Sequence, residues 1–319
     1  MPIGEHNSLV AWLDELPSWA KIGVVGGAAL VLYIPYKVWT SRTRPSPYVE
    51  NWKPDVVYLY QFPRIRRIPN ASPFCLKLET WLRMSDVQYE IPEVPMSIRS
   101  KEGTLPFVEL NGVEYHDSTF IIRDLDKMLP NHTSIDDHLS PEQKAASMAF
   151  EALIEKPLLL SSMVFRIENL DKLIDLLNPK DLGMLAPIVK PLVFNNFSKA
   201  LVSKIDASDL GFHSRDERVR IGSDAIRALS DYLGTKHYLH GFKPTKVDAS
   251  LFGILAQILY APYDSDHKDV LIGECHNLVE FVERVKSRFW PDWDDVTTTY
   301  STETNWKRRP LHRSNGKAH

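Results

Sequence analysis

Cysteine is scarce in this sequence of 319 residues, which contains only Cys75 and Cys275. A secreted chain of this length usually carries more cysteines as a disulfide framework, so we expect a reducing compartment and two free, buried thiols. A soft metal ion needs several thiolates at bonding distance. Because the two cysteines lie in different halves of the chain, the sequence predicts no metal site.

A strong charge excess and internal repeats are also missing. The 38 lysines and arginines against 41 aspartates and glutamates give a net charge of −3, and no basic face rich in aromatic residues is evident. This balance argues against a nucleic-acid partner. With 44% hydrophobic residues, a chain of this length is expected to form two structural units with tails.

Only one long apolar run is present, at residues 22–36, flanked by lysines and, further out, by Trp19 and Trp39. It is shorter than the roughly 20 residues that span a bilayer, but flanking lysines can snorkel and tryptophans favour the membrane interfaces. We predict one transmembrane helix over residues 18–39.

Two other interpretations of this run stay open: a cleaved signal peptide and a buried helix of a soluble protein. The preceding residues are acidic and no small-residue cleavage site follows, which favours an uncleaved signal anchor. Lys37, Arg42 and Arg44 follow the run, so the positive-inside rule places the main domain in the cytoplasm. The anchor suits the mitochondrial outer membrane and the endoplasmic reticulum equally. The spacing of Gly23 and Gly27 is compatible with a homodimer.

The next segment has the pattern of a thioredoxin-like domain. β-Branched and aromatic runs, a Ser-Pro helix start and an Asn-Gly turn predict the order βαβββα. The expected strands are 55–61, 89–94, 107–110 and 113–116, and the expected helices are 72–84 and 118–129.

Beyond Pro141 the pattern is helical throughout. The clearest helices are expected at 142–167, 217–233, 247–260 and 278–289. The fold class is therefore α/β plus all-α. The expected organisation is a polar segment at 1–17, the transmembrane helix at 18–39, a linker at 40–54, the thioredoxin-like domain at 55–132, a helical domain at 133–295 and a disordered tail at 296–319.

Ser72, at the start of the first helix of this domain, is the candidate for chemistry. In redox-active members of this fold a nucleophilic cysteine occupies this position, and a serine there cannot form a dithiol pair with Cys75. Its hydroxyl can instead donate a hydrogen bond to the sulfur of a bound thiol and lower that thiol's pKa. The alternative is that Ser72 only caps the helix.

Two further features accompany Ser72. Leu105-Pro106 precedes a strand, where thioredoxin-like folds place a cis proline whose preceding residue pairs with an extended peptide. Asp117-Ser118 begins the next helix and can hold the ammonium and carboxylate of an amino acid, or can serve only as a cap. Together the three features predict a glutathione-type pocket.

The helical half carries structural motifs. Thr245 and Asp248 form a capping box with aspartate in place of glutamate, which we assign to folding. Gly253 would allow close helix packing, and the WPDW motif at 290–293 is expected to dock the C-terminus. Residues 171–214 form a long segment whose apolar stretch PIVKPLVFNNF either packs on the core or lies on a membrane.

These motifs resemble the glutathione S-transferase superfamily. TLPFVEL, the NG turn and the DS pair match its N-terminal domain, and PTKVDASLFG matches its C-terminal folding signature. SPFCLKLETWLRM, KPTKVDASLFGILAQ and RVKSRFWPDW narrow the resemblance to the failed axon connections family, including nematode cadmium-responsive proteins, with metaxins as cousins. The resemblance covers residues 55–294 and extends to the membrane segment.

The resemblance implies a role in axon development and in metal or stress responses. Ser72 would activate the thiol of glutathione, and Leu105 would pair with its backbone. Asp117 and Ser118 would hold its γ-glutamyl end. Two departures, Asp117 where a longer acid or amide is usual and Phe120 where a small residue is usual, would shrink the pocket.

Two hypotheses follow. The first is a membrane-anchored binding or adaptor protein with little catalysis and no tightly bound cofactor. The second is an active glutathione transferase that uses Ser72 to conjugate glutathione to electrophiles.

Overall fold

The computed structural model describes residues 16–18, 20, 47–94, 98–130, 132–178 and 186–308, with side chains from 194 onward in the last range. The chain divides into two compact units, Met1–Glu50 and Asn51–His319, and every element named below belongs to the second. The predicted transmembrane helix at 18–39 falls almost entirely outside the described residues. Among the helices that are described, none combines the length and apolar character needed to cross a membrane.

The first half of the second unit has the predicted βαβββα order. Its elements are β1 (Val57–Tyr60), α3 (Pro73–Met84), β2 (Tyr89–Glu90), β3 (Phe107–Leu110), β4 (Val113–His116) and α4 (Ser118–Met128). The sheet order is β2-β1-β3-β4, with β1 parallel to β2 and antiparallel to β3. Leu110 pairs with Val113 around Asn111-Gly112, and both turn residues have positive φ, as a two-residue type I′ hairpin requires.

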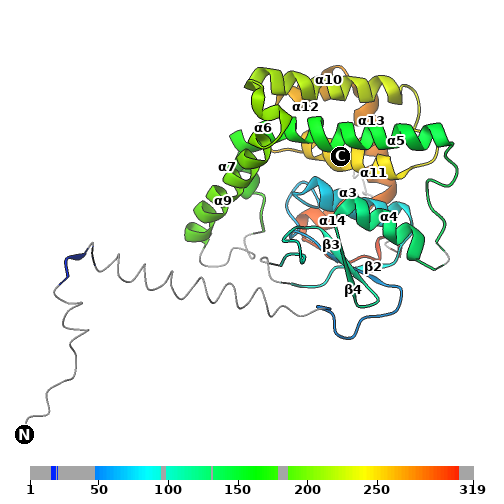
Figure 1. Cartoon of the computed structure of the whole chain (residues 1–319), viewed down its shortest axis with the longest axis horizontal. Helices are drawn as coiled ribbons and strands as arrows, with labels where there is room; N and C mark the ends of the chain where they lie inside the picture. Colours follow the sequence, from blue (N-terminus) through cyan, green and yellow to red (C-terminus); the bar gives the residue numbers. More distant parts are fainter. Residues whose placement is uncertain are drawn as a thin grey trace, which may run out of the picture. The chain divides into compact units, whose positions relative to one another are not determined.

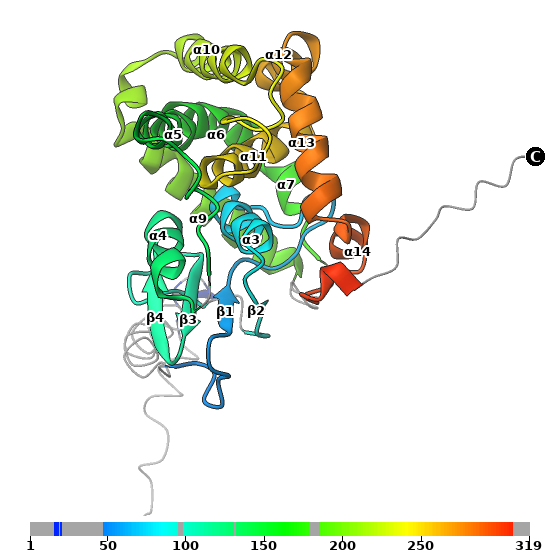
Figure 2. The same cartoon turned by 90° about the vertical axis from the view of Figure 1, so that its right-hand side faces the viewer.

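Helix α3 is buried from Cys75 to Met84. Figures 1 and 2 show it between the sheet and the helices of the second half, where α11 (Lys246–Leu259) packs against it. A Cβ atom added to Gly253 would lie 2.7 Å from the Pro73 carbonyl oxygen. The expectation that Gly253 permits close helix packing is therefore confirmed.

The second half is helical. Its other elements are α5 (Pro141–Leu153), the π-helix η1 (Ile154–Leu158), α6 (Leu159–Glu168), α7 (Leu170–Ile174), α9 (Ala186–Asp206), the 3₁₀ helix η3 (Asp209–Phe212), α10 (Arg215–Leu233), α12 (Asp266–Gly273), α13 (His276–Phe289), α14 (Trp293–Thr298) and the 3₁₀ turn η4 (Trp306–Arg308). The single helix expected at 142–167 is interrupted at η1, which contains Pro157. Proline lacks the N–H that a regular α-helix needs at this position.

The C-terminal boundary also differs from expectation. A disordered tail was expected from residue 296, yet α14 continues to Thr298. Val296 is fully buried in the core, and the Thr297 hydroxyl donates to the Trp293 carbonyl at 2.9 Å. Trp306 packs against the same core. A few apolar contacts thus order a segment that lacks any hydrophobic periodicity.

Candidate functional site

Ser72 caps helix α3, and Pro73 occupies its first turn. The Ser72 hydroxyl oxygen accepts a hydrogen bond from the Cys75 backbone N–H at 3.4 Å. Ser72 is half-buried. Its oxygen therefore caps the first turn of its own helix.

The two thiols are free and buried, as predicted. Burial raises the pKa of Cys75 to about 12, although the Phe62 N–H and the Ser72 hydroxyl oppose the shift. Burial also raises the pKa of Cys275. Because the thiolate is the reactive form, neither cysteine is a nucleophile at neutral pH.

The proline loop has the predicted geometry, since the Leu105–Pro106 peptide bond is cis. Pro106 is buried and Leu105 is half-buried. The preceding loop is held by the Ser100 N–H, which donates to the Thr104 carbonyl at 3.0 Å.

Asp117 caps helix α4 with φ of 65°. Its carboxylate accepts from the backbone N–H groups of Thr119 at 2.9 Å and Phe120 at 3.2 Å. Ser118 is buried, whereas Phe120 is 59% exposed. That Phe120 narrows a glutathione pocket remains a prediction.

Strand register relates the cis proline to Asp117. Phe107, which follows the proline, pairs with Tyr60 on one side and with His116 on the other. His116 leads directly into Asp117, and Tyr60 begins the connection that carries Ser72. A tripeptide pocket formed by these residues remains a prediction.

The helical half holds the loop before Ser72. Arg166 Nη2 donates to the Ala71 carbonyl at 2.6 Å, and Gln257 Nε2 donates to the Asn70 carbonyl at 2.9 Å. The buried Asn70 side chain accepts from the Ser72 N–H at 2.9 Å. Neither Arg166 nor Gln257 stands out in the sequence, because both lie in helices far from Ser72 along the chain. The only local signal is Asn70 two residues before Ser72, a common turn pattern.

Lys77 occupies the cleft beside the start of α3. Its ammonium is 2.9 Å from the Thr119 hydroxyl and 2.8 Å from a Glu151 carboxylate oxygen, and it also pairs with Glu155. The Lys77 side chain is only 3% exposed. The cavity between Lys77 and α11, lined also by Phe74, has a volume of about 10 Å³, enough for one water molecule.

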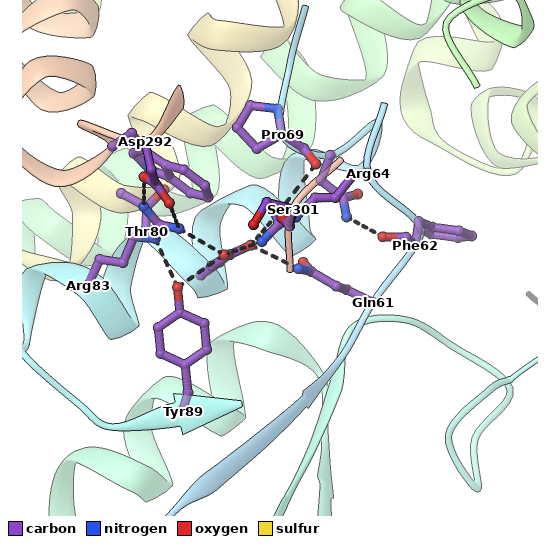
Figure 3. Close-up of polar contacts among 12 residues, drawn as sticks. Gln61, Phe62, Arg64, Pro69, Thr80, Arg83, Tyr89, Asp292 and Ser301 are labelled. Atoms are coloured by element: carbon purple, nitrogen blue, oxygen red, sulfur yellow. Dashed lines mark hydrogen bonds and ion pairs between the residues drawn. The ribbon is translucent and has the colours of Figure 1, made fainter. Parts of the chain in front are cut away.

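A buried charge cluster lies on the other side of α3 (Figure 3). Arg64 makes a bidentate pair with Glu79, with N–O distances of 2.6 and 2.7 Å. Gln61 and the Tyr89 hydroxyl also donate to Glu79, at 2.8 and 3.0 Å. Burial opposes ionisation of Glu79, but Arg64 and Arg83 outweigh it and lower its pKa to about 2. Glu79 is therefore a structural anion and unsuited to proton transfer at neutral pH.

The WPDW motif docks on this cluster, as expected. Arg83 donates to both Asp292 oxygens, at 2.6 and 3.1 Å, and its guanidinium lies 3.7 Å from the Trp290 ring centroid. Trp290 Nε1 donates to the Thr80 hydroxyl at 3.1 Å. Arg64 reaches further along the chain, to the Ser301 carbonyl at 3.2 Å. Residues 290–301 thus supply hydrogen-bond partners to buried side chains of the thioredoxin-like half.

The expected capping box at the start of α11 is present. Asp248 accepts from the Thr245 N–H at 2.8 Å, from the Thr245 hydroxyl and from the Leu239 N–H at 2.9 Å. Thr245 and Asp248 are both fully buried. These bonds fix the start of a core helix, which is a folding role.

No group of three or more histidine, cysteine, aspartate or glutamate side chains that could hold a metal ion occurs among the described residues. The absence of a metal site remains a prediction for the whole chain.

Comparison with known proteins agrees with this geometry. Models of the glutathione S-transferase N-terminal and C-terminal domains match residues 73–172 and 222–285. A solved structure of glutathione transferase GSTFuA3 from Phanerochaete chrysosporium superposes with a TM-score of 0.51 at 16% identity, covering 74% of this chain and 98% of that one. The chain belongs to the glutathione S-transferase superfamily.

Curated relatives narrow the relationship. Failed axon connections of Drosophila melanogaster is 34% identical over 78% of this chain and 61% of its own length. Metaxin-3 of Xenopus laevis is 24% identical over 74% of this chain and 77% of its own length. The resemblance to failed axon connections and, more distantly, to metaxins is confirmed. The match leaves more than a third of the Drosophila protein uncovered.

Proposed function

We propose that this chain is a membrane-anchored, glutathione-transferase-like binding or adaptor protein with little catalytic activity. The observation that carries the proposal is that helix capping accounts for both candidate polar groups without a ligand. The Ser72 oxygen accepts from the Cys75 N–H, and Asp117 Oδ1 accepts from the Thr119 and Phe120 N–H groups. Neither residue needs a bound tripeptide to explain its place at a helix start.

The relatives supply the biological context of the proposal. The name of the Drosophila relative refers to axon connections, and we extend a role in axon development or stress response to this chain. The binding partner would dock on a fold whose thiol chemistry is suppressed, because Cys75 stays protonated at neutral pH.

The membrane anchor is the part of the proposal that rests on residues 18–39. Basic residues follow this run, so we propose that both halves of the second unit face the cytoplasm, on the mitochondrial outer membrane or the endoplasmic reticulum. Protease added to sealed vesicles should digest residues 141–294 together with the thioredoxin-like half. Protection of the folded unit would refute this topology, and imaging of the tagged full-length chain would identify the membrane.

The alternative is an active glutathione transferase, and one observation favours it. The cis Leu105–Pro106 bond supports it, as does the register in which Phe107, after the proline, pairs with His116, before Asp117. The Ser72 oxygen can keep its bond from the Cys75 N–H while its O–H donates to the sulfur of bound glutathione.

Conjugation of glutathione to a general electrophile by the full-length chain in detergent separates the two functions. The adaptor proposal expects turnover close to the uncatalysed rate. Ser72→Ala is compared with Ser140→Ala, because Ser140 caps α5 through the Gln143 N–H and both variants lose one helix cap. Strong wild-type turnover that is lost in Ser72→Ala and kept in Ser140→Ala would establish the transferase instead.

A further inference from the structure

A small cavity lined by both apolar and polar side chains lies in the helical half, beside the two residues that hold the loop before Ser72. Its volume is about 10 Å³, and Arg166, Tyr263, Ser265 and His267 contribute to its lining. This is about the space that one water molecule or one monatomic ion requires. Phosphate and organic carboxylates are too large for it.

Arg166 brings an uncompensated positive charge to this cavity. The side chain is 7% exposed, and its two hydrogen-bond acceptors, the Ala71 carbonyl and the Gln257 amide oxygen, are both neutral. Within the described ranges, no carboxylate lies within ion-pair distance of its guanidinium. Burial lowers the pKa of Arg166. A buried charge of this kind is stabilised by a counter-ion.

His267 lines the same cavity and has a ring nitrogen without a hydrogen-bond partner. It is fully buried, and Nε2 lies 3.1 Å from both the Val219 carbonyl and the Ser161 hydroxyl. Because the carbonyl can only accept, Nε2 carries a proton. Nδ1 has no hydrogen-bond partner. A neutral ring presents a lone pair at Nδ1, whereas a protonated ring presents an N–H donor.

The groups around His267 favour joint binding of an anion and a proton. Its own helix contributes Asp266, whose charge favours the protonated ring, while burial lowers the pKa of His267. On the α10 side it meets the Val219 carbonyl and Gly222, which do not titrate. On the α6 side the ring meets the Ser161 hydroxyl, and Arg166 of the same helix lines the same cavity. An anion bound between Arg166 and His267 would favour protonation of the ring.

We propose that this cavity binds one monatomic anion of the halide class between Arg166 and His267, and that His267 takes up one proton with it. Ser265 and Tyr263 have hydroxyl hydrogens that can complete the ion's coordination. Since Arg166 also holds the Ala71 carbonyl, the bound ion would stabilise the loop before Ser72. The inference is independent of whether the protein is an adaptor or a transferase.

Thermal unfolding of the full-length chain in detergent tests the proposal, with sodium chloride or bromide replacing sodium gluconate at constant ionic strength. At about pH 5.5, halide should raise the unfolding midpoint by about 2–4 °C. At about pH 7.5 the rise should be smaller, because one proton must be bound with each ion. A halide effect that does not change with pH would overturn the proton uptake.

Substitutions at the cavity test whether the halide effect on the unfolding midpoint arises there. Arg166→Met should abolish the halide response, and His267→Gln should remove its pH dependence. Arg220→Met is the matched control, because Arg220 is an exposed arginine on α10. An equal response in Arg166→Met and Arg220→Met would overturn the site.

Crystals of the wild-type chain grown in bromide keep the proposal testable if Arg166→Met fails to fold. Anomalous scattering at the bromine edge should show one peak in the cavity beside Arg166, and Arg166→Lys should weaken it. A cavity that holds only water, with no anomalous peak, would refute anion binding.

Discussion

Glu79 and Asp248 are both fully buried carboxylates, one in each half of the molecule, yet their pKa values move in opposite directions. Burial opposes ionisation of Glu79, but Arg64 and Arg83 lower its pKa to about 2. Burial raises the pKa of Asp248 to about 6, although Leu239 and Thr245 donate hydrogen bonds to it. The neutral donors at Asp248 offset less of the loss of water around the charge than the two arginines do at Glu79.

Glu79→Gln is expected to have the largest effect on the stability of the fold. It leaves Arg64 and Arg83 buried with Asp292 as their remaining carboxylate, so the free energy of unfolding should fall by about 3–5 kcal/mol. Urea titration measures this loss. Glu90→Gln, which breaks an exposed ion pair with Lys53, should change the stability little. Equal effects in the two variants would show that the cluster is solvated.

Asp248→Asn is expected to cause a smaller loss of stability. The amide keeps one acceptor oxygen but turns a donor toward the N–H of Leu239 or Thr245, which should lower the free energy of unfolding by about 1–3 kcal/mol at neutral pH. The matched change Asp269→Asn, on the surface of α12, should be silent in the same titration. A neutral result for Asp248→Asn would mean that relief of the buried charge equals the lost hydrogen bond.

The pH dependence of stability should separate the two carboxylates. Asp248 keeps its proton in the folded state up to about pH 6 but loses it near the ordinary aspartate pKa of 3.8 when unfolded, so its contribution to stability falls as pH rises through this window. Glu79 contributes to stability above the ordinary glutamate pKa of 4.5, and this contribution is lost as pH falls toward 2. Unfolding midpoints recorded across this range should therefore lose the first slope in Asp248→Asn and the second in Glu79→Gln. Unchanged slopes would contradict the assigned directions.

The smallest effect is expected for Gln61→Leu. The substitution removes one donor to Glu79 but also removes Gln61 Oε1, a buried oxygen without a hydrogen-bond partner. The two changes oppose each other, so the stability should change by about 1 kcal/mol or less. A loss as large as that of Glu79→Gln would show that the amide, and not the arginines, holds the carboxylate.

Local signals explain which parts of the fold could be predicted from the sequence. The Asn111-Gly112 turn, the Ser72-Pro73 helix start and the Thr245–Asp248 capping box each depend on residues a few positions apart. The predicted strands and helices follow from such patterns. The cis bond at Pro106 was accessible only through the likeness to the thioredoxin fold.

Long-range pairings explain what could not be predicted. Lys77, Glu79 and Arg83 in α3 are charged residues of the kind that usually face solvent, yet all three are buried in the fold. Their partners lie as far as 209 residues away. The hydrogen bond from Arg166 to the Ala71 carbonyl is also long-range. No local sequence pattern predicts this contact, which holds the loop before Ser72.

The contact between Arg83 and Asp292 can form only late in the synthesis of the chain. Arg83 leaves the ribosome 209 residues before Asp292, and Arg64 leaves it 237 residues before Ser301. Until those residues arrive, two guanidinium groups share the single carboxylate of Glu79. The half of the molecule that is translated first can therefore complete its buried ion pairs only after the C-terminal segment has been made, and a chain truncated before residue 292 would present an incomplete face to chaperones and proteases.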